Sequence, residues 1–305
     1  MSADLGWQPG TLARARSLMR RALRGALGAR GEEAVHLAYH AGLRVIDRFD
    51  PPEDPATLAV LAAFAGRART IVDIGANVGR YSWFLRRNAP ADAAVTALEP
   101  HPGAARLLRR TLRSLAGATV LEVGASDRDA TAELVVPAGA FGSPVSGLAW
   151  VRRGGDPGVE RGTTIPIRRL DGLVSDGLIT PIEPIFVKID VEGGEAAVLR
   201  GATDLLKEHR PIVYLECQAA SLARQGESSD AVWAELERHG YRLFANRSGS
   251  FVPTGTALDG VVNYLAVADW TSAGDGALDL IMLDAVVDRW ATRRGPVAAP
   301  SAHAG

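Results

Sequence analysis

The sequence TIVDIGANVGRYSWFL, residues 70–85, changes from the pattern of a strand to that of a helix within a few residues. Its first five residues are β-branched or apolar apart from Asp73, which predicts a buried strand. Gly75 and Gly79 follow, and a helical pattern begins at Gly79. Glycine permits a tight turn and a close approach of the backbone to a ligand, and the start of a helix offers free N–H groups. The stretch therefore predicts a strand, a ligand-binding turn and a helix.

The alternation of strand and helix continues along residues 56–268. Further strands are expected at residues 94–98, 119–123, 185–190, 212–216, 241–244 and 261–267. Helical patterns are expected at residues 103–115, after residue 194 and at residues 230–239. This order predicts an α/β fold with a mostly parallel sheet and helices on both faces.

Two further segments flank this domain. Residues 1–55 are predicted to form a helical N-terminal segment, which ends near a break at the prolines of residues 50–52. Residues 269–305 are expected to form a C-terminal helix followed by a disordered tail. The sequence thus predicts one α/β domain with an addition at each end.

Residues 137–161 interrupt the alternation and are rich in glycine and proline. Extra strands are expected on either side of them, at residues 133–136 and 164–168. The segment is either a cover over the edge of the sheet that contacts the substrate or an uninvolved surface insertion.

The composition excludes several classes of protein. The 34 basic and 35 acidic residues give a formal net charge of -1, so nucleic acid is not expected as a partner. Cys217 is the only cysteine, which excludes an internal disulfide framework and agrees with a reducing compartment. The apolar stretch of residues 56–65 is much shorter than the roughly 20 residues of a membrane helix. We therefore expect a cytoplasmic globular protein.

The glycine loop after the first strand favours one class of cofactor over another. Dinucleotide-binding loops have the pattern G-x-G-x-x-G, whereas this loop is D-x-G-x-N-x-G, from Asp73 through Gly75 and Asn77 to Gly79. The acid at its entrance would repel a pyrophosphate, and the lysine of a phosphate-binding loop is absent. A cofactor with a cationic amino-acid end and no phosphates fits better. S-adenosylmethionine is such a molecule.

Two later strand ends support this cofactor. Glu99 ends the second strand, where an acid can accept hydrogen bonds from both ribose hydroxyls. After the third strand, Ser126 and Asp127 lie where an adenine could bind, and Asp127 could accept a hydrogen bond from its amino group. Each signal is weak alone, and the three in this order point to one binding site.

The sequence VKIDVEGGEAAVL, residues 187–199, places charged residues at the end of the fourth strand. With a two-residue period, Lys188, Asp190 and Glu192 fall on one face. The chain has only two lysines, which suggests that Lys188 is retained for its compact ammonium group; the alternative is a structural partner for Asp190 or Glu192. The charged face is therefore expected to open onto the reaction site.

At these residues the sequence resembles the FkbM family of S-adenosylmethionine-dependent methyltransferases. The matching segments are VDIGANVG (72–79), LEPHP (98–102), GASD (124–127), RRLDGL (168–173), KIDVEGGEAAVLRGA (188–202) and RPIVYLE (210–216). The resemblance implies a Rossmann-like class I methyltransferase fold, with a sheet of seven strands and the last strand antiparallel. It also implies O-methylation of a hydroxyl on acceptors such as sugars, polyketides and other secondary metabolites.

The resemblance also implies roles for individual residues. The methionine part of the cofactor would contact residues of the glycine loop, namely Asp73, Gly75, Asn77 and Gly79. Glu99 would bind the ribose, and Ser126 with Asp127 would bind the adenine. Asp190 would close the site at the end of the fourth strand.

Methyl transfer to an alcohol needs alignment of donor and acceptor and removal of a proton. Asp190 is the first candidate for this base, with Lys188 and Glu192 tuning it and Glu216 closing the far side. Lys188 is a second candidate if burial displaces its proton.

Two other interpretations use the same residues. Asp190, Glu192 and Glu216 could instead bind a magnesium-like cation, as in catechol O-methyltransferases, although Lys188 already offsets their charge. A binding protein that keeps the cofactor pocket without chemistry is the other alternative. The acids at the end of the fourth strand favour catalysis.

Residues 12–30 combine a leucine-rich stripe with bordering arginines. Such a basic amphipathic pattern could contact an anionic membrane surface or a lipid-linked acceptor, or could pack on the domain or on a partner subunit of a homo-oligomer.

Overall fold

The structure is a computed structural model, and it describes residues 49–136, 149–152, 162–268, 286–288 and 290–291. The chain divides into two units, residues 1–50 and residues 51–305, and the account below concerns the second. The predictions for the N-terminal segment, for residues 12–30, for most of residues 137–161 and for the tail lie outside the described residues. No described helix is long and apolar enough to span a bilayer.

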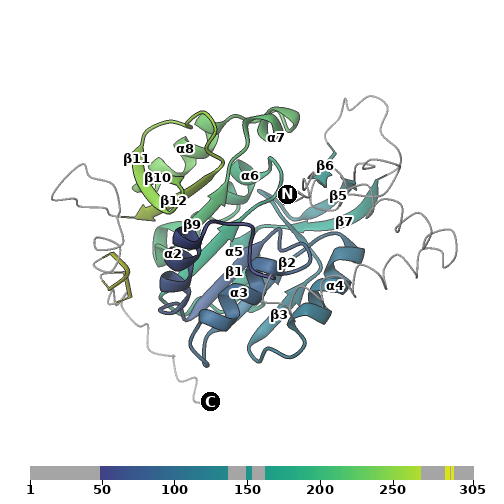
Figure 1. Cartoon of the computed structure of the whole chain (residues 1–305). Coiled ribbons are helices and arrows are strands. Elements are labelled where there is room, and N and C mark those ends of the chain that lie inside the picture. Colours follow the sequence, from purple (N-terminus) through teal and green to yellow (C-terminus); the bar gives the residue numbers. More distant parts are fainter. Residues whose placement is uncertain (1–48, 137–148, 153–161, 269–285, 289, 292–305) are drawn as a thin grey trace, which may run out of the picture. The chain divides into compact units, whose positions relative to one another are not determined.

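The main sheet follows the predicted α/β pattern (Figure 1). Its strands lie in the order β11-β10-β12-β9-β8-β1-β2-β3. Five neighbouring strands pair in parallel, namely β1 (Thr70–Ile74), β2 (Ala94–Leu98), β3 (Ala118–Leu121), β8 (Ile185–Ile189) and β9 (Ile212–Glu216). The last strand, β12 (Asn263–Ala268), is antiparallel to both β9 and β10 (Tyr241–Arg247). The predicted fold class and the antiparallel last strand are confirmed.

The sheet has eight strands rather than the expected seven. The additional strand, β11 (Ser250–Thr254), pairs with β10 in a hairpin whose two loop residues are Ser248 and Gly249. Both loop residues have positive φ, +53° and +82°, as two-residue hairpin turns of the primed type require. The seven other strands account for the expected number, and β11 lies at one edge of the sheet, so this strand is an addition there.

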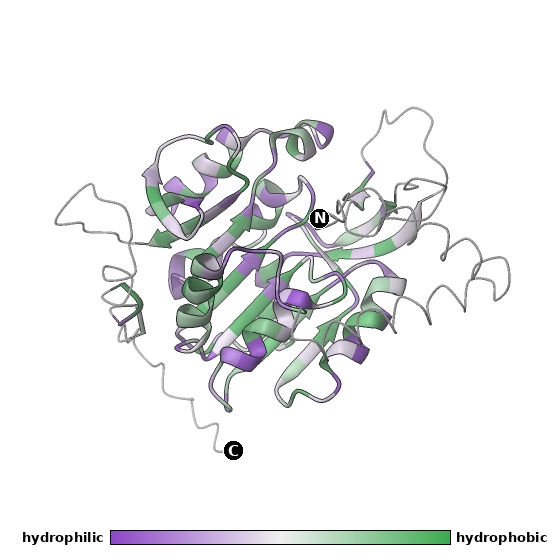
Figure 2. Cartoon of the chain, in the orientation of Figure 1, coloured by the Kyte–Doolittle hydropathy of each residue, from purple (hydrophilic) through white to green (hydrophobic). Residues whose placement is uncertain are grey.

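Helices cover both faces of the sheet. They are α2 (Pro55–Ala65), α3 (Arg80–Asn88), α4 (Pro102–Leu112), α5 (Leu170–Ser175), α6 (Glu195–Arg200), α7 (Ala219–Arg224) and α8 (Ser229–Arg238), with a π-helical turn at Leu205–His209. Every residue of β1 and β8 is buried, as expected of central parallel strands covered on both faces. Figure 2 shows these strands as mainly hydrophobic.

The two faces of the sheet belong to different parts of the core. Ile71 and Phe186 pack with α2 and α3, whereas their neighbours Val72 and Val187 pack with α6 and α8. The side-chain alternation of a strand explains this division. The helix expected after residue 194 is α6, and it ends at Arg200. A side chain on the next residue, Gly201, would lie 2.0 Å from the carbonyl oxygen of Ser126, so only glycine permits this contact.

A second sheet lies beside the main sheet and has the order β4-β7-β5-β6. Its strands are β4 (Gly124–Ala125), β5 (Ala130–Val135), β6 (Trp150–Val151) and β7 (Thr163–Arg168). The extra strands expected on either side of residues 137–161 are therefore confirmed. They are long enough to form an antiparallel pair with a small apolar core of Leu134, Ile165 and Ile167.

Candidate active site

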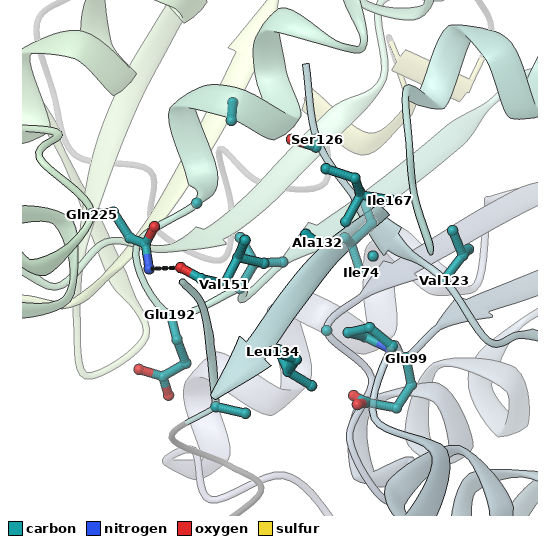
Figure 3. Close-up of a pocket in the computed structure, with 18 of the residues that line it drawn as sticks. Ile74, Glu99, Val123, Ser126, Ala132, Leu134, Val151, Ile167, Glu192 and Gln225 are labelled. Atoms are coloured by element: carbon teal, nitrogen blue, oxygen red, sulfur yellow. Dashed lines mark hydrogen bonds between the residues drawn. The ribbon is translucent and has the colours of Figure 1, made fainter. Parts of the chain in front are cut away.

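A cavity of about 380 Å³ lies where β1, β2 and β8 end (Figure 3). On its other side, Ala132, Leu134, Val151 and Ile167 of the second sheet line it. Of the residues predicted to form the site, the cavity is lined by Gly75, Asn77, Glu99, Ser126, Asp190 and Glu192. Its position outside the carboxyl ends of parallel strands is where open α/β sheets bind ligands.

The glycine loop forms part of this cavity with its backbone. Gly75 has a φ of +74°, and a Cβ atom there would lie 1.7 Å from the carbonyl oxygen of Asp190. Only glycine therefore lets the loop after β1 touch the loop after β8. Asn77 also has a positive φ, +49°, and its backbone N–H donates to Oε2 of Glu99 at 2.8 Å.

Glu99 is held at the end of β2 with its carboxylate at the cavity. The other carboxylate oxygen, Oε1, accepts a hydrogen bond from the backbone N–H of His101 at 2.8 Å. The residue is 6% exposed, and this burial raises the pKa of Glu99 to about 7, although both backbone donors favour the charged form. Glu99 can accept further hydrogen bonds, because each carboxylate oxygen carries a second lone pair.

Asp73 and Gly79 take other positions in the structure. Asp73 is fully buried, accepts a hydrogen bond from Oγ of Ser82 at 2.5 Å and faces Nζ of Lys188 at 3.4 Å. Gly79 has a φ of +92°, and a Cβ atom there would lie 2.6 Å from Leu108 of α4. Neither residue lines the cavity, so the structure gives both a part in supporting the loop, and their contact with a cofactor stays a prediction.

Lys188 is only 3% exposed and does not line the cavity. Its Nζ lies 3.1 Å from Oδ2 of Asp190 and 3.4 Å from the carbonyl oxygen of Gly75, and 4.7 Å from the centre of the Tyr81 ring. Burial alone would lower the pKa of Lys188, but the charges of Asp190 and Asp73 outweigh it and raise the pKa. These contacts favour a fixed cation over the alternative in which Lys188 acts as a base.

A polar network beside Lys188 was missed by the sequence analysis. Oε1 of Glu53 accepts hydrogen bonds from the hydroxyls of Tyr81 at 2.5 Å and Tyr214 at 2.8 Å, and from Nδ2 of Asn263 at 3.1 Å. Glu53 fixes the ring of Tyr81 over Lys188 by this contact. Glu53 is one of two acids between Pro52 and Pro55, where no periodic pattern marks it, and it lies within the residues assigned to the N-terminal segment.

The loop after β8 contains two glutamates with different surroundings. Glu192 has a φ of +55°, lines the cavity, and its Oε2 accepts a hydrogen bond from Oγ of Ser221 at 3.1 Å. Burial and the nearby Asp190 raise the pKa of Glu192. Glu195, also missed by the sequence analysis, accepts hydrogen bonds from the backbone N–H groups of Val191 at 3.3 Å and Gly193 at 3.1 Å. It therefore fixes the loop that carries Asp190 and Glu192.

Glu216 ends β9 and accepts a hydrogen bond from Gln218. Burial and the charge of Asp190 raise the pKa of Glu216 to about 7. The residue does not line the cavity, so the structure brings it near the acids of the β8 loop but not to the cavity surface. Its predicted role at the far side of the site stays a prediction.

The two residues expected at the adenine differ in their position relative to the cavity, although Oγ of Ser126 donates a hydrogen bond to Oδ1 of Asp127 at 3.3 Å. Ser126 lines the cavity, whereas the carboxylate of Asp127 pairs with Arg128 at 2.9 Å and faces Arg200 at 3.8 Å. Asp127 is outside the cavity lining, and its contact with adenine stays a prediction.

The described part of the chain contains no group of three histidine, cysteine, aspartate or glutamate side chains arranged to hold a metal ion. The acids considered for magnesium have other partners, since Lys188 contacts Asp190, Ser221 contacts Glu192 and Gln218 contacts Glu216. This donor set does not fit the metal alternative.

Comparison with known families assigns the domain. The sequence model described as "Methyltransferase FkbM domain" matches residues 73–243, more than half of the chain. The chain belongs to the FkbM methyltransferase family. The match confirms the predicted family and a methyltransferase enzyme. It covers the glycine loop, Glu99 and the loop after β8. A comparison with curated proteins finds no match.

Several solved structures are similar to this methyltransferase at low identity. A methyltransferase FkbM from Methylobacillus flagellatus KT has a TM-score of 0.41 and 20% identity, covering 66% of this chain and 44% of that one. An O-methyltransferase from Bacillus cereus in complex with SAH has a TM-score of 0.40 and 15% identity, covering 83% and 97%. The O-methyltransferase TomG from Streptomyces achromogenes, in complex with SAM, has a TM-score of 0.39 and 15% identity, covering 70% and 78%.

Proposed function

We propose that this methyltransferase transfers the methyl group of S-adenosylmethionine to a hydroxyl of a small molecule, of the sugar or secondary-metabolite type. The observation that carries the proposal is that one cavity joins the glycine loop, the carboxylate of Glu99 and the acidic loop after β8. When bound, S-adenosylmethionine supplies an electrophilic methyl group on a sulfonium centre.

The residues present fit this cofactor. The glycine loop lines the cavity at Gly75 and Asn77, and Glu99 offers a buried acceptor for ribose hydroxyls. The acids Glu99, Asp190 and Glu192 in the cavity lining attract a cation and repel a pyrophosphate. These features support S-adenosylmethionine over a dinucleotide.

The second sheet supports a small acceptor. Its apolar residues Ala132, Leu134 and Val151 face the cavity opposite the end of β8. Gln225, next to α7, donates a hydrogen bond to the carbonyl oxygen of Val151 at 2.8 Å (Figure 3) and so ties this wall to the main domain. A cavity walled on both sides suits a small molecule with an apolar part better than a flat macromolecular surface.

Calorimetry with S-adenosylhomocysteine tests the cofactor. We expect binding by the wild-type protein and a loss of about 10- to 100-fold in affinity for Glu99→Gln, because a charged acceptor of two hydroxyls becomes neutral. Glu237→Gln, a change at an exposed glutamate of α8, serves as the matched control with unchanged affinity. Binding of NAD without binding of S-adenosylhomocysteine would contradict the proposal.

Methyl transfer from labelled S-adenosylmethionine tests the acceptor class. A panel of sugars, aliphatic alcohols, carboxylic acids and amines is incubated with the enzyme, and mass spectrometry locates the added methyl group. We expect label on hydroxyl oxygen. Label on nitrogen or carboxylate would contradict O-methylation of a hydroxyl, and cofactor binding without any transfer would favour the non-catalytic alternative.

A further inference from the structure

The carboxylates around the end of β8 differ in how free they are to accept a proton. Asp190 is paired with the buried ammonium of Lys188 at 3.1 Å. Glu216 is held by Gln218 and lies outside the cavity lining. Glu192 lines the cavity and receives a hydrogen bond from a neutral hydroxyl, that of Ser221.

The backbone of the β8 loop directs Glu192 into the cavity. The chain leaves the strand after Ile189 and takes positive φ at Glu192, +55°, and at Gly193, +105°. A Cβ atom at Gly193 would lie 2.2 Å from the carbonyl oxygen of Ser221, so the turn is pressed against α7. Positive φ costs about 1–3 kcal/mol at a residue with a side chain, and such strain concentrates at functional sites. The two-residue period of a strand does not apply to Glu192, which the turn reorients.

We infer that Glu192 is the general base of the reaction and that the acceptor is a neutral alcohol. This inference rests on the proposed function. The acceptor oxygen forms a bond to the methyl carbon while the bond from that carbon to sulfur breaks, and its electron pair stays on sulfur. The hydroxyl proton passes to the carboxylate of Glu192. The products are the methyl ether, S-adenosylhomocysteine and protonated Glu192, which returns its proton to solvent.

The charges around Glu192 agree with both parts of the inference. The acids near it are Asp190, in the loop after β8, and Glu216, at the end of β9. The cations near it are Lys188 on β8 and Arg224 on α7. Burial and Asp190 raise the pKa of Glu192, which brings it closer to neutral pH, where a general base is most effective. The two arginines of the cavity lining, Arg128 and Arg152, already pair with Asp127 and Glu133. The carboxylates near Glu192 would therefore repel a negatively charged acceptor but not a neutral alcohol.

The first test compares acceptor probes. Formation of S-adenosylhomocysteine is measured by mass spectrometry with methyl α-D-glucopyranoside, glycerol and benzyl alcohol, and with the matching carboxylates glucuronate and benzoate. We expect turnover with at least one alcohol and none with the carboxylates. Turnover of a carboxylate, or of no alcohol, would overturn the neutral-alcohol assignment. Binding of S-adenosylhomocysteine, measured separately, reports on the proposed function itself.

The second test removes the base. We expect Glu192→Gln to lower kcat by about 10²- to 10⁴-fold and to change the affinity for S-adenosylhomocysteine by less than about threefold. Glycine tolerates the positive φ, so Glu192→Gly keeps the fold. Added formate should raise the rate of this variant at least tenfold, because formate can occupy the space of the missing carboxylate. Loss of less than about threefold in kcat, or absence of rescue by formate, would overturn the assignment.

The third test moves the pKa of the base without removing it. Ser221 donates to the charged form of Glu192 and so lowers its pKa. Ser221→Ala should therefore shift the acidic limb of the kcat/KM profile to higher pH, while Ser221→Thr retains the wild-type profile. A profile that does not move in Ser221→Ala would overturn the role of Glu192, because a merely structural effect would change the rate at every pH.

Discussion

The loops that follow β1 and β8 use the same backbone device for different purposes. Both leave a buried central strand through residues with positive φ, Gly75 and Asn77 in one and Glu192 and Gly193 in the other. The loop after β1 presents its backbone, and its polar contacts serve to hold that backbone against Glu99. The loop after β8 presents a side chain, that of Glu192.

This difference shows that the charged residues near the site have two roles. Some are buried and hold the loops in place, and others line the cavity. Asp73 and Lys188 are buried and paired with each other. Through Nζ of Lys188 this pair contacts the loops after β1 and β8, at Gly75 and Asp190. Glu99 and Glu192 reach the cavity from two separate strands, and Figure 3 shows them on either side of Leu134. The predictions below test this division.

The largest effect is expected from Gly75→Ala, because the two loops touch at this residue. A Cβ atom 1.7 Å from the carbonyl oxygen of Asp190, together with the positive φ, should lower the free energy of unfolding by about 4 kcal/mol or more. Urea denaturation measures this change, and calorimetry should find no binding of S-adenosylhomocysteine.

The matched control for Gly75→Ala is Gly255→Ala. Gly255 has no neighbour within 4 Å of an added Cβ atom, so its substitution should alter the free energy of unfolding by less than about 1 kcal/mol. A Gly75→Ala protein as stable as this control would show that the loops do not touch.

The next largest effect is expected from Lys188→Met, which leaves the buried carboxylate of Asp73 without its cation. Breaking a buried ion pair costs about 3–5 kcal/mol of unfolding free energy, and chemical denaturation measures the loss. Adding Asp73→Asn should recover part of the stability, because the uncompensated charge is then removed. Equal stability of the Lys188→Met and wild-type proteins would mean that Lys188 is not a structural cation.

A smaller, pH-dependent effect is expected at Glu195. Burial raises the pKa of Glu195 to about 7, above its usual value, so the folded protein keeps a proton that the unfolded chain has already lost. The resulting stability is present at low pH and is lost as the pH rises through about 7. Glu195→Gln stays neutral and should make the protein about 1–2 kcal/mol more stable than wild type at pH 8 and flatten the dependence.

The readout for Glu195 is the urea midpoint between pH 5 and pH 8, with Glu237→Gln as the control that follows the wild-type curve. A Glu195→Gln curve with the wild-type slope would contradict the raised pKa.

The fold could be predicted largely from the sequence, because the central strands β1 and β8 are short runs of mainly β-branched and apolar residues, each interrupted by only one charged residue, Asp73 or Lys188. The hairpin strand β11 could not, since its turn at Ser248 and Gly249 joins strands that lie at the edge of the sheet. The sequence indicates that a helix follows residue 194 but not where it ends, and the contact of Gly201 with Ser126 joins residues far apart in the sequence.

The sequence predicts which strand ends form the candidate site, but it does not predict which side chains contact one another there. Gly75 and Glu99 follow from local patterns, and both line the cavity. The contacts of Asp73 and Glu53 depend on partners far along the chain, Lys188 for Asp73 and Tyr214 for Glu53. The orientation of Glu192 depends on a turn geometry that a strand period cannot represent.

The positive φ of Glu192 also has a consequence for the evolution of this enzyme. Glycine would occupy that backbone conformation with less strain, so a selection for heat resistance alone would favour Glu192→Gly. With Glu192 as the base, the same replacement removes the group that takes the proton. On this inference Glu192 exchanges some stability for turnover, so directed evolution for thermostability needs a parallel screen for turnover to retain it.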